Sequence, residues 1–424
     1  MNARFGNGTD HAMAAIASAR RAVAVERWSS IGLDVEVVPL AALSAIAQPW
    51  SALAARAVEP NVFLEPAFAM AAMPIFGDGA QAGLIWSQSS PRELLGLFPI
   101  RIEHWRYGLP LPVLTGWTHP FAPFGVPLVH RDVAEPVVSA WLDHISQDAS
   151  LPSLMLLPYV CDDGGFATVL DGVLARRGCA TASFDRHQRA LLAPGEDRAG
   201  YIERAIAIKQ RRELARKWRR LQDLGAAEIV RAIEPADVLA QLDEFFRIEA
   251  SGWKGRVGTA AARDDDIRRF MAEVVSTLVP RDQATIRCLK VGGKAIAAAI
   301  TLNSGNTAWG WKVAYDESYA RFSPGVQLLV HLTQDMLADT TIVQVDSTAT
   351  ANHPMIDHIW RERRTMSDRL IAAKPHTMIP FSLVSGLETL RRRGRDGAKA
   401  LREQLRSRHR PDNSVTRAGA AADE

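Results

Sequence analysis

The stretch from residue 321 to residue 350 constrains the fold most, because a helix start is followed there by a buried strand. Ser323 is a residue type that caps helices, and Pro324 suits the first helical position, where its missing N–H costs nothing. Six side chains then recur at helical spacing and predict one buried face: Val326, Leu329, Val330, Thr333, Met336 and Leu337. After a turn, an apolar strand over residues 342–346 ends at Asp346.

The start of this helix is open to a ligand. Gly325 removes a side chain there, so the free N–H groups of the first turn stay accessible. A helix N-terminus carries partial positive charge and can bind a phosphate. A capped core helix after a turn explains the same residues, so the surrounding elements have to decide between the two.

Length and composition describe a soluble globular protein of two domains. The chain has 424 residues, 47% hydrophobic and 23% charged, and this length exceeds one ordinary core. The net charge of +3 does not imply nucleic-acid binding. Three cysteines without metal-ligand spacing argue against a disulfide framework, and we expect no metal. The alanine-rich N-terminus is a poor signal peptide and the apolar residues 295–302 are too few to span a bilayer, so we expect a cytoplasmic protein.

The first half of the chain alternates strands with helices. Strands are expected at 33–40, 82–88, 93–103, 112–117, 153–157 and 180–192, and helices at 41–57, 61–72, 134–147 and 165–177. Helices interleaved with strands at this spacing predict an α/β fold. We expect the aromatic, proline-rich loop 120–127 to lie over a cleft.

The second half repeats this order. Strands are expected at 227–233, 284–291, 294–303, 307–314, 342–346 and 365–372, and helices at 236–250, 264–278, 323–337 and 354–363. The dipeptide Gly292-Gly293 predicts a two-residue hairpin turn, whereas residues 251–261 read as a loop. In both halves the expected order is therefore strand, two helices, antiparallel strands, helix, strand, helix and strand. This shared order of elements predicts that the second half duplicates the fold of the first.

A basic linking helix, or a bent pair of helices, separates the two halves. Its basic side chains are Lys209, Arg211, Arg212, Arg216, Lys217, Arg219 and Arg220. A solvated face at a domain junction explains them better than a nucleic-acid site does. The expected segments are a flexible leader (1–30), a first domain (31–193), the linking helix (194–226), a second domain (227–380), and a basic helix with a disordered tail (381–424).

The order of elements resembles the GCN5-related N-acetyltransferases (GNATs). The resemblance is carried by EASGWKG (249–255), the Gly-Gly hairpin, AYDESYARFSPGVQLLVHL (314–332), VDSTATANHPMIDHIWRERR (345–364) and, in the first half, FLEPAFAMAA (63–72). The second half resembles the CelD-type domain of cellulose biosynthesis, which is similar to the tandem FemABX peptidyltransferases. This implies an α/β (α+β) fold of two tandem GNAT-like domains, each a mixed, mostly antiparallel sheet flanked by helices. We expect the first to be degenerate, because it has no SPG-like helix start.

The resemblance implies acetyl-CoA or another acyl-CoA as donor, with its pyrophosphate at one helix start. The donor-binding residues would be Arg321, Ser323, Pro324, Gly325, Val326 and Gln327. The last three offer backbone N–H groups, and Arg321 could pair with a phosphate. The pantetheine arm would lie between the splayed strands 307–314 and 342–346.

Acylation of an amine or hydroxyl needs a path for the nucleophile's proton and a thioester held beside the acceptor. The expected catalytic residues are Asp346, His353 and Asp357. His353 titrates near neutrality and Asp357 could orient it, although a capped helix start explains this pair too. Many relatives carry a Tyr-Lys pair where residues 353–357 stand in this chain.

Four residues are expected to bind the acceptor: Glu249, Trp253, Lys254 and Trp311. Tryptophans in glycine-rich loops can stack on sugars or on the adenine of CoA, and they also serve as packing between domains.

Three functions follow. The first is an acyl-CoA-dependent N- or O-acyltransferase acting on an amino sugar or polysaccharide precursor. The second is a FemABX-like transferase using aminoacyl-tRNA, which the basic helix favours. The third is a non-catalytic scaffold of a polysaccharide synthase complex, which the missing Tyr-Lys pair favours. Nucleic acid is expected only in the second, and a homodimer is one option for the assembly.

Overall fold

A single mixed sheet of 13 strands runs through the part of the chain that the computed structural model describes, residues 32–374 and 380–408. The side chains of residue 396 and residues 399–408 are outside this description. The strands are β1 (Leu33–Pro39), β2 (Ala80–Ser87), β3 (Leu94–Glu103), β4 (Val113–Gly116), β5 (Leu128–Val129), β6 (Leu154–Cys161), β7 (Thr181–Leu192), β8 (Ala227–Arg231), β9 (Ala284–Val291), β10 (Lys294–Ser304), β11 (Thr307–Tyr315), β12 (Gln344–Asp346) and β13 (Glu362–Ala372).

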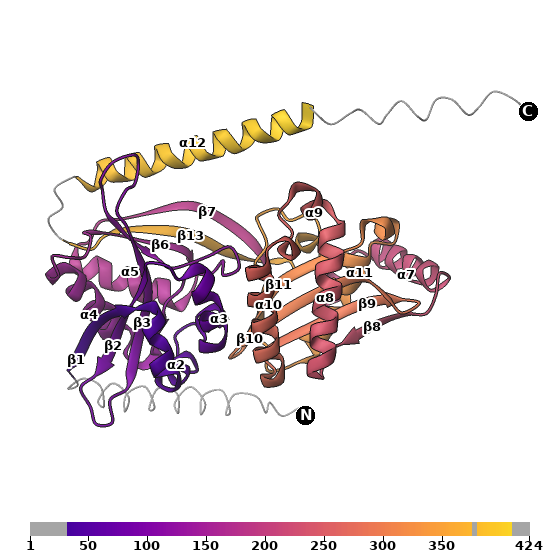
Figure 1. The fold of residues 1–424 in the computed structure, drawn as a ribbon, viewed down its shortest axis with the longest axis horizontal. Helices are drawn as coiled ribbons and strands as arrows, with labels where there is room; N and C mark the ends of the chain where they lie inside the picture. The colour runs from indigo at the N-terminus through magenta and orange to yellow at the C-terminus, as the bar shows by residue number, and fades with distance from the viewer. Residues whose placement is uncertain (1–31, 375–379, 409–424) are drawn as a thin grey trace, which may run out of the picture.

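Helices flank this sheet on both sides (Figure 1). The α-helices are α2 (Ala47–Ala54), α3 (Pro66–Phe76), α4 (Ala134–Gln147), α5 (Gly165–Arg177), α6 (Tyr201–Ala205), α7 (Ile208–Gln222), α8 (Pro235–Ser251), α9 (Trp253–Val257), α10 (Asp265–Leu278), α11 (Pro324–Ala338) and α12 (Phe381–Arg408). The 3₁₀ helices are η1 (Leu40–Ile46), η2 (Val62–Leu64), η3 (Arg131–Val133), η4 (Ala261–Arg263), η5 (Val279–Arg281), η6 (Glu317–Phe322) and η7 (Ile356–His358).

The two halves of the chain exchange their last strands. The sheet order is β1-β2-β3-β4-β6-β13-β7-β12-β11-β10-β9-β8, so β13 of the second half pairs with β6 of the first, and β7 of the first half pairs with β12 of the second. Figure 1 shows β7 and β13 running together between the two halves. Among the strands of the described residues, only the pairs β4·β6 and β11·β12 are parallel, which confirms a mostly antiparallel sheet. The proposed boundary at residue 193 therefore lies within a continuous sheet.

Aromatic side chains pack the two halves together. Phe68 on α3 lies edge-on to Phe270 on α10 and to Trp311 on β11, with ring centroids 5.6 Å apart in both cases. Phe121, from the loop predicted to cover a cleft, lies 5.4 Å from Phe270 and accepts a hydrogen bond from the Trp311 indole at 2.8 Å. Large aromatic surfaces of this kind dominate core energetics, so the halves share one core.

Most predicted elements are confirmed, including α4 and α5 at their predicted bounds and the bent pair α6–α7. Gly292 and Gly293 both have positive φ angles (54° and 81°), as a two-residue hairpin requires. The predicted duplication of order also holds, except that a 3₁₀ turn replaces the helix between the last two strands of the second half.

Three local predictions are wrong. Residues 354–363 do not form a helix: only η7 is helical, and β13 begins at Glu362, because pairing with β6 and β7 extends that strand. The loop 251–261 contains helix α9, which ends at Gly258 with a φ of 80°. On α11 the most buried side chains include Leu328 and Leu332, which lie outside the predicted face. The reason is that side chains of this helix pack into two separate apolar clusters. The leader 1–30 and the tail beyond residue 408 lie outside the described residues.

Candidate functional site

The parallel strands β11 and β12 separate and leave a cleft. They pair only where Thr307, Ala308 and Trp309 lie opposite residues 344–346, after which β12 ends and β11 continues. The cleft has a volume of about 590 Å³. It is lined by Trp253, Lys254, Gly310, Trp311, Lys312, Val313, Tyr315, Ala320, Ser323, Pro324, Gly325, Val326, Ser347, Thr348, Ala349, His353, Pro354 and Met355. The structure thus brings most of the predicted donor and acceptor residues to one place.

Strand β11 carries a β-bulge beside the cleft. Opposite β10, Thr301 pairs with Gly310 but the next residue, Ile300, pairs with Lys312, which leaves Trp311 without a partner residue. A bulge interrupts the ladder and redirects the side chains next to it. The hydroxyl of Thr348 holds the opposite wall close by donating to the Gly310 carbonyl at 2.7 Å.

The start of α11 forms one end of the cleft. Pro324 occupies the first turn as predicted and has no N–H, so Gly325 and Val326 supply the first backbone N–H groups, which lack partners within the helix. The N–H of Gln327 is already bonded to the Ser323 carbonyl at 3.0 Å, and its side chain donates to the Leu214 carbonyl, so the prediction that Gln327 offers a free donor is wrong.

Ser323 does not cap the helix through its side chain. Its backbone is left-handed, with a φ of 55°, and no hydrogen bond from its hydroxyl to the helix is present. Instead the hydroxyl lies 2.9 Å from Nζ of Lys217 on α7. This contact brings a cation to the open helix start. Arg321 does not line the cleft; its exposed guanidinium lies 4.7 Å from the ring centroid of Phe322.

Gly325 is needed for close approach. A Cβ at this position would lie 3.1 Å from Cδ1 of Tyr315 and 3.2 Å from the sulfur of Met355. These distances are tighter than ordinary van der Waals contact, so a larger residue would have to displace both walls of the cleft at the helix start.

Asp346, predicted as a catalytic residue, is buried in an ion-pair network and does not line the cleft. Its carboxylate is fully buried, and Oδ2 lies 2.6 Å from Arg189 and 2.9 Å from Arg364. Its other oxygen accepts the Thr348 N–H at 2.9 Å. Although burial opposes ionisation, the two arginines and this hydrogen bond lower the pKa of Asp346 below its usual value. The carboxylate anchors the end of β12, and both of its oxygens are occupied.

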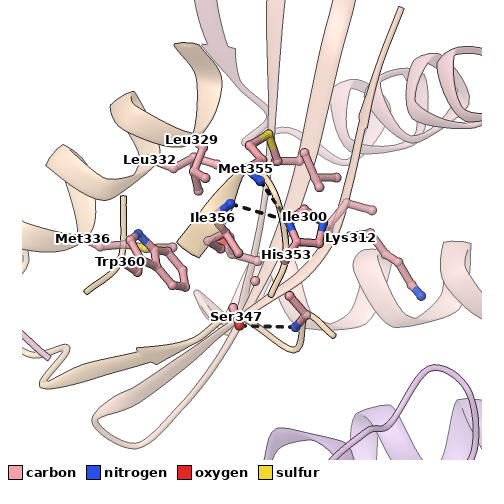
Figure 2. Close-up of a pocket in the computed structure, with 15 residues that line it drawn as sticks. Ile300, Lys312, Leu329, Leu332, Met336, Ser347, His353, Met355, Ile356 and Trp360 are labelled. Carbon is pink, nitrogen blue, oxygen red and sulfur yellow. Dashed lines mark hydrogen bonds between the residues drawn. The ribbon is translucent and has the colours of Figure 1, made fainter. Parts of the chain in front are cut away.

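His353 lines the cleft, as predicted, but Asp357 does not orient it. Nδ1 of His353 accepts long hydrogen bonds from the N–H groups of Met355 (3.4 Å) and Ile356 (3.5 Å), drawn as dashed lines in Figure 2. The capped-turn interpretation is therefore the one the structure supports. The Asp357 carboxylate lies 3.8 Å from Arg363. Burial lowers the pKa of His353, so its imidazole is neutral at pH 7 and carries its proton on Nε2.

A small apolar pocket opens beside His353 (Figure 2). Its volume is about 70 Å³, which is room for about two groups the size of a water molecule. Figure 2 shows Leu332, Met336 and Trp360 on its walls, with the indole N–H of Trp360 bonded to the Thr333 hydroxyl at 2.9 Å.

Three of the four predicted acceptor residues, Trp253, Lys254 and Trp311, line the same cleft. Trp253 lines it and is 58% exposed, whereas Trp311 lines it from a buried position. Glu249 is buried and does not line the cleft; it accepts from Lys254 at 2.6 Å and from the Ala261 N–H at 2.9 Å. Its role is to hold Lys254 and the chain after α9 in place.

Lys312 is a cleft residue that the sequence analysis missed. Its partly buried side chain lines both the cleft and the apolar pocket, and Nζ lies 4.1 Å from the ring centroid of Phe121. Burial and the nearby charge of Lys254 lower its pKa to about 8. Its only signal in the sequence was a lysine inside an otherwise apolar strand, TAWGWKVAY.

A family model described as "Acetyltransferase (GNAT) domain" matches residues 209–352, which include both walls of the cleft. This part of the chain is a GNAT acetyltransferase domain. The resemblance of the sequence to GNATs is thereby confirmed, whereas the finer likeness to CelD-type proteins stays a prediction. A search of curated proteins finds no match to the chain.

The solved structure of FemX extends the likeness of fold to both halves. FemX has a TM-score of 0.52 and 11% identity, over 77% of this chain and 95% of FemX. A conserved protein of unknown function from Bacteroides thetaiotaomicron VPI-5482 has a TM-score of 0.47 and 12% identity, over 80% and 99%. The C-terminal domain of a putative lysylphosphatidylglycerol synthetase from Agrobacterium fabrum has a TM-score of 0.47 and 11% identity, over 77% and 91%. At these identities the likeness to FemX concerns the fold alone.

Two absences hold for the residues that the structure describes. None of their helices combines the length and apolar character that crossing a bilayer requires. No group of three or more His, Cys, Asp or Glu side chains among them is arranged to hold a metal ion.

Proposed function

We propose that this protein is an acyl-CoA-dependent N- or O-acyltransferase, with the donor bound in the cleft of the GNAT domain. The observation that carries the proposal is that a helix start with open N–H groups and a strand opening meet in one cleft, with Lys217 beside the helix start. The N–H groups of Gly325 and Val326, together with Lys217, suit a pyrophosphate. The opening between β11 and β12 then suits an extended arm.

When bound, the donor supplies a thioester, the group that the acceptor attacks. The bulge at Trp311 leaves backbone groups of β11 outside the ladder, where an N–H can polarise a carbonyl. The 70 Å³ pocket beside His353 suits a short acyl group, such as acetyl. His353 holds a proton on Nε2 and can donate it, whereas its Nδ1 is occupied by the turn at Met355 and Ile356.

The acceptor class follows from the resemblance and from the open end of the cleft. Trp253 and Trp311 offer aromatic surfaces of the kind that stack on sugar rings. An amino sugar or a polysaccharide precursor is therefore the acceptor we propose.

Calorimetric titration of the full chain with acetyl-CoA tests the donor. We expect one site per chain with a dissociation constant in roughly the micromolar range, as enzymes of this type bind near physiological substrate levels. Absence of binding at millimolar acetyl-CoA would contradict the proposal and leave transfer from aminoacyl-tRNA or the non-catalytic scaffold.

One observation favours a second donor, aminoacyl-tRNA. The side chains of four exposed basic residues on α7 form no hydrogen bond or ion pair with other described residues: Lys209, Arg212, Arg219 and Arg220. A phosphate backbone could bind along this face, with affinity that falls steeply as salt rises. Retention of the protein on immobilised tRNA at moderate salt would support this donor. Elution at low salt would leave acyl-CoA as the proposed donor.

A further inference from the structure

The acceptor end of the cleft holds more positive charge than nearby groups neutralise. Lys254 and Lys312 both line it, and the nearby carboxylate is Glu249. Both oxygens of Glu249 are occupied, one by Lys254 at 2.6 Å and the other by the Ala261 N–H at 2.9 Å. The side chain of Lys312 forms no hydrogen bond or ion pair with any residue that the structure describes. One cationic side chain therefore remains without a counterion.

Aromatic rings surround the amine of Lys312. Nζ lies 4.1 Å from the ring centroid of Phe121 and 5.9 Å from that of Trp311. Figure 2 shows this amine directed away from the apolar pocket. Cation–π contacts attract the ammonium but accept no hydrogen bond, so its N–H groups stay available. Burial of an ammonium without such partners is costly, which the lowered pKa of Lys312 reflects.

His119, whose pKa is affected by the charge of Lys312, is neutral and is not a counterion for it. His119 is only 8% exposed and stacks on Phe76 with ring centroids 4.3 Å apart. Burial first and the charge of Lys312 second lower its pKa to about 3, so it is neutral at pH 7. Neither of its ring nitrogens has a hydrogen-bond partner among the described residues. It lies in the same aromatic cluster, through Phe76 and Phe121, whose rings are 6.0 Å apart.

We propose that Lys312 binds an oxyanion of the acceptor, a carboxylate or a phosphate, while Trp253 and Trp311 contact the rest of the acceptor. The proposal rests on the acyltransferase function and adds a substrate class to it: acceptors that carry a negative charge. An oxyanion at Nζ would form a charge-assisted hydrogen bond and would neutralise the excess charge of Lys254 and Lys312.

Binding can be measured without turnover. The full chain is saturated with CoA, so that the donor end is filled, and is then titrated with inorganic phosphate in a calorimeter, with sodium chloride as the ionic control. We expect Lys312→Met to weaken phosphate binding by about tenfold or more, because a charge-assisted bond is lost. Lys290→Met removes a lysine from β9 outside the cleft and should bind phosphate as the wild type does.

Turnover adds a second readout. Acetyl-CoA consumption is compared for two acceptor pairs that differ in charge, glucosamine with glucosamine 6-phosphate and alaninamide with alanine. We expect the anionic member of the preferred pair to have the higher kcat/KM, and Lys312→Met to remove that preference while Lys312→Arg retains it. The affinity for CoA should be the same in all three proteins.

Three results would overturn the proposal. Equal phosphate binding by wild type and Lys312→Met, or none by either, would show that no oxyanion site exists at Lys312. A loss of CoA affinity in Lys312→Met would place the lysine in the donor site. Loss of activity in Lys312→Arg equal to that in Lys312→Met, with phosphate binding intact, would make it a proton acceptor. Failure of CoA itself to bind would contradict the acyltransferase function, which is a separate result.

Discussion

Arg189 and Asp346 form a buried ion pair between the two halves of the chain, with Nη2 of Arg189 2.6 Å from Oδ2 of Asp346. Arg189 lies on β7 and Asp346 ends β12, so the pair fixes the exchanged strand at the point where the cleft opens. Arg364 on β13 adds a second pair at 2.9 Å. The junction between the halves therefore also shapes the GNAT cleft.

Replacing Asp346 by alanine should destabilise the protein strongly. The change leaves two buried guanidinium groups without their shared carboxylate, and removal of one partner of a buried pair costs about 3–5 kcal/mol. Urea unfolding at pH 7 measures this loss. Glu213→Ala breaks the exposed pair with Arg216 and serves as the control, with no measurable change expected. Equal stability of the two variants would show that the buried network is not a structural anchor.

Helix α11 could be predicted from the sequence, but the ion pairs of this carboxylate could not. Ser323-Pro324-Gly325 and the helical spacing after it are local signals, and they correctly predicted α11 and its open start. The partners of Asp346 are 157 residues before it and 18 residues after it, on strands whose exchange no local pattern encodes. Because these partners are distant in sequence, Asp346 was predicted to be a catalytic residue from its position at a strand end.

Lys312 was missed for the same reason. Its amine lies over the ring of Phe121, a residue of the first half that packing of the two halves brings to β11. His353 was predicted correctly as a cleft residue because it lies in the short segment after β12, but its hydrogen bonds to the turn depend on a chain path that β13 imposes.

Removal of Lys217 should weaken donor binding. Its Nζ lies 2.9 Å from the Ser323 hydroxyl beside the open helix start, where a pyrophosphate would gain a charged hydrogen bond. Such bonds contribute about 1.5–3 kcal/mol, so Lys217→Met should lower CoA affinity by roughly ten- to hundredfold in calorimetry. Arg220→Met, on the exposed face of the same helix, should not change it. A similar loss of affinity in both variants would indicate a diffuse polyanion site.

The size of the apolar pocket should limit the acyl chain. Met336 lines this pocket of about 70 Å³, and Met336→Ala would enlarge it. One methylene group in a hydrophobic pocket changes discrimination by about tenfold or more. The variant should therefore raise the affinity for hexanoyl-CoA relative to acetyl-CoA by about tenfold or more. Competition titrations measure the ratio, with Val343→Ala, at an exposed position, as the control. An unchanged ratio would place the acyl group elsewhere.

Helix α12 should detach from the sheet in acid. Glu388 is buried, which opposes its ionisation, but a hydrogen bond from Arg391 and ion pairs with Arg106 at 3.0 Å and with Arg392 lower its pKa to about 2 from 4.5. Because the folded-state pKa is the lower one, the stabilisation is fully present above about pH 4.5 and is lost as the pH falls toward 2. Limited proteolysis with pepsin between pH 5 and pH 2 should show α12 released progressively.

Glu388→Gln tests this assignment at neutral pH. The variant should lose α12 protection in hydrogen exchange at pH 7, because Arg106 and Arg392 are left without their buried carboxylate. Glu228→Gln on the edge strand β8 is the matched control. Protection of α12 that is unchanged in Glu388→Gln would contradict the assignment.

The most direct test of the donor site is titration of two glutamate variants with acetyl-CoA. Gly325→Glu places a carboxylate at the open helix start, whereas Gly386→Glu makes the same change on α12, where a Cβ meets nothing within 4 Å. Equal melting temperatures would establish that both fold. We predict that Gly386→Glu binds acetyl-CoA as the wild type does and that Gly325→Glu shows no binding at millimolar ligand. Equal affinity of the two variants would contradict the placement of the donor in this cleft.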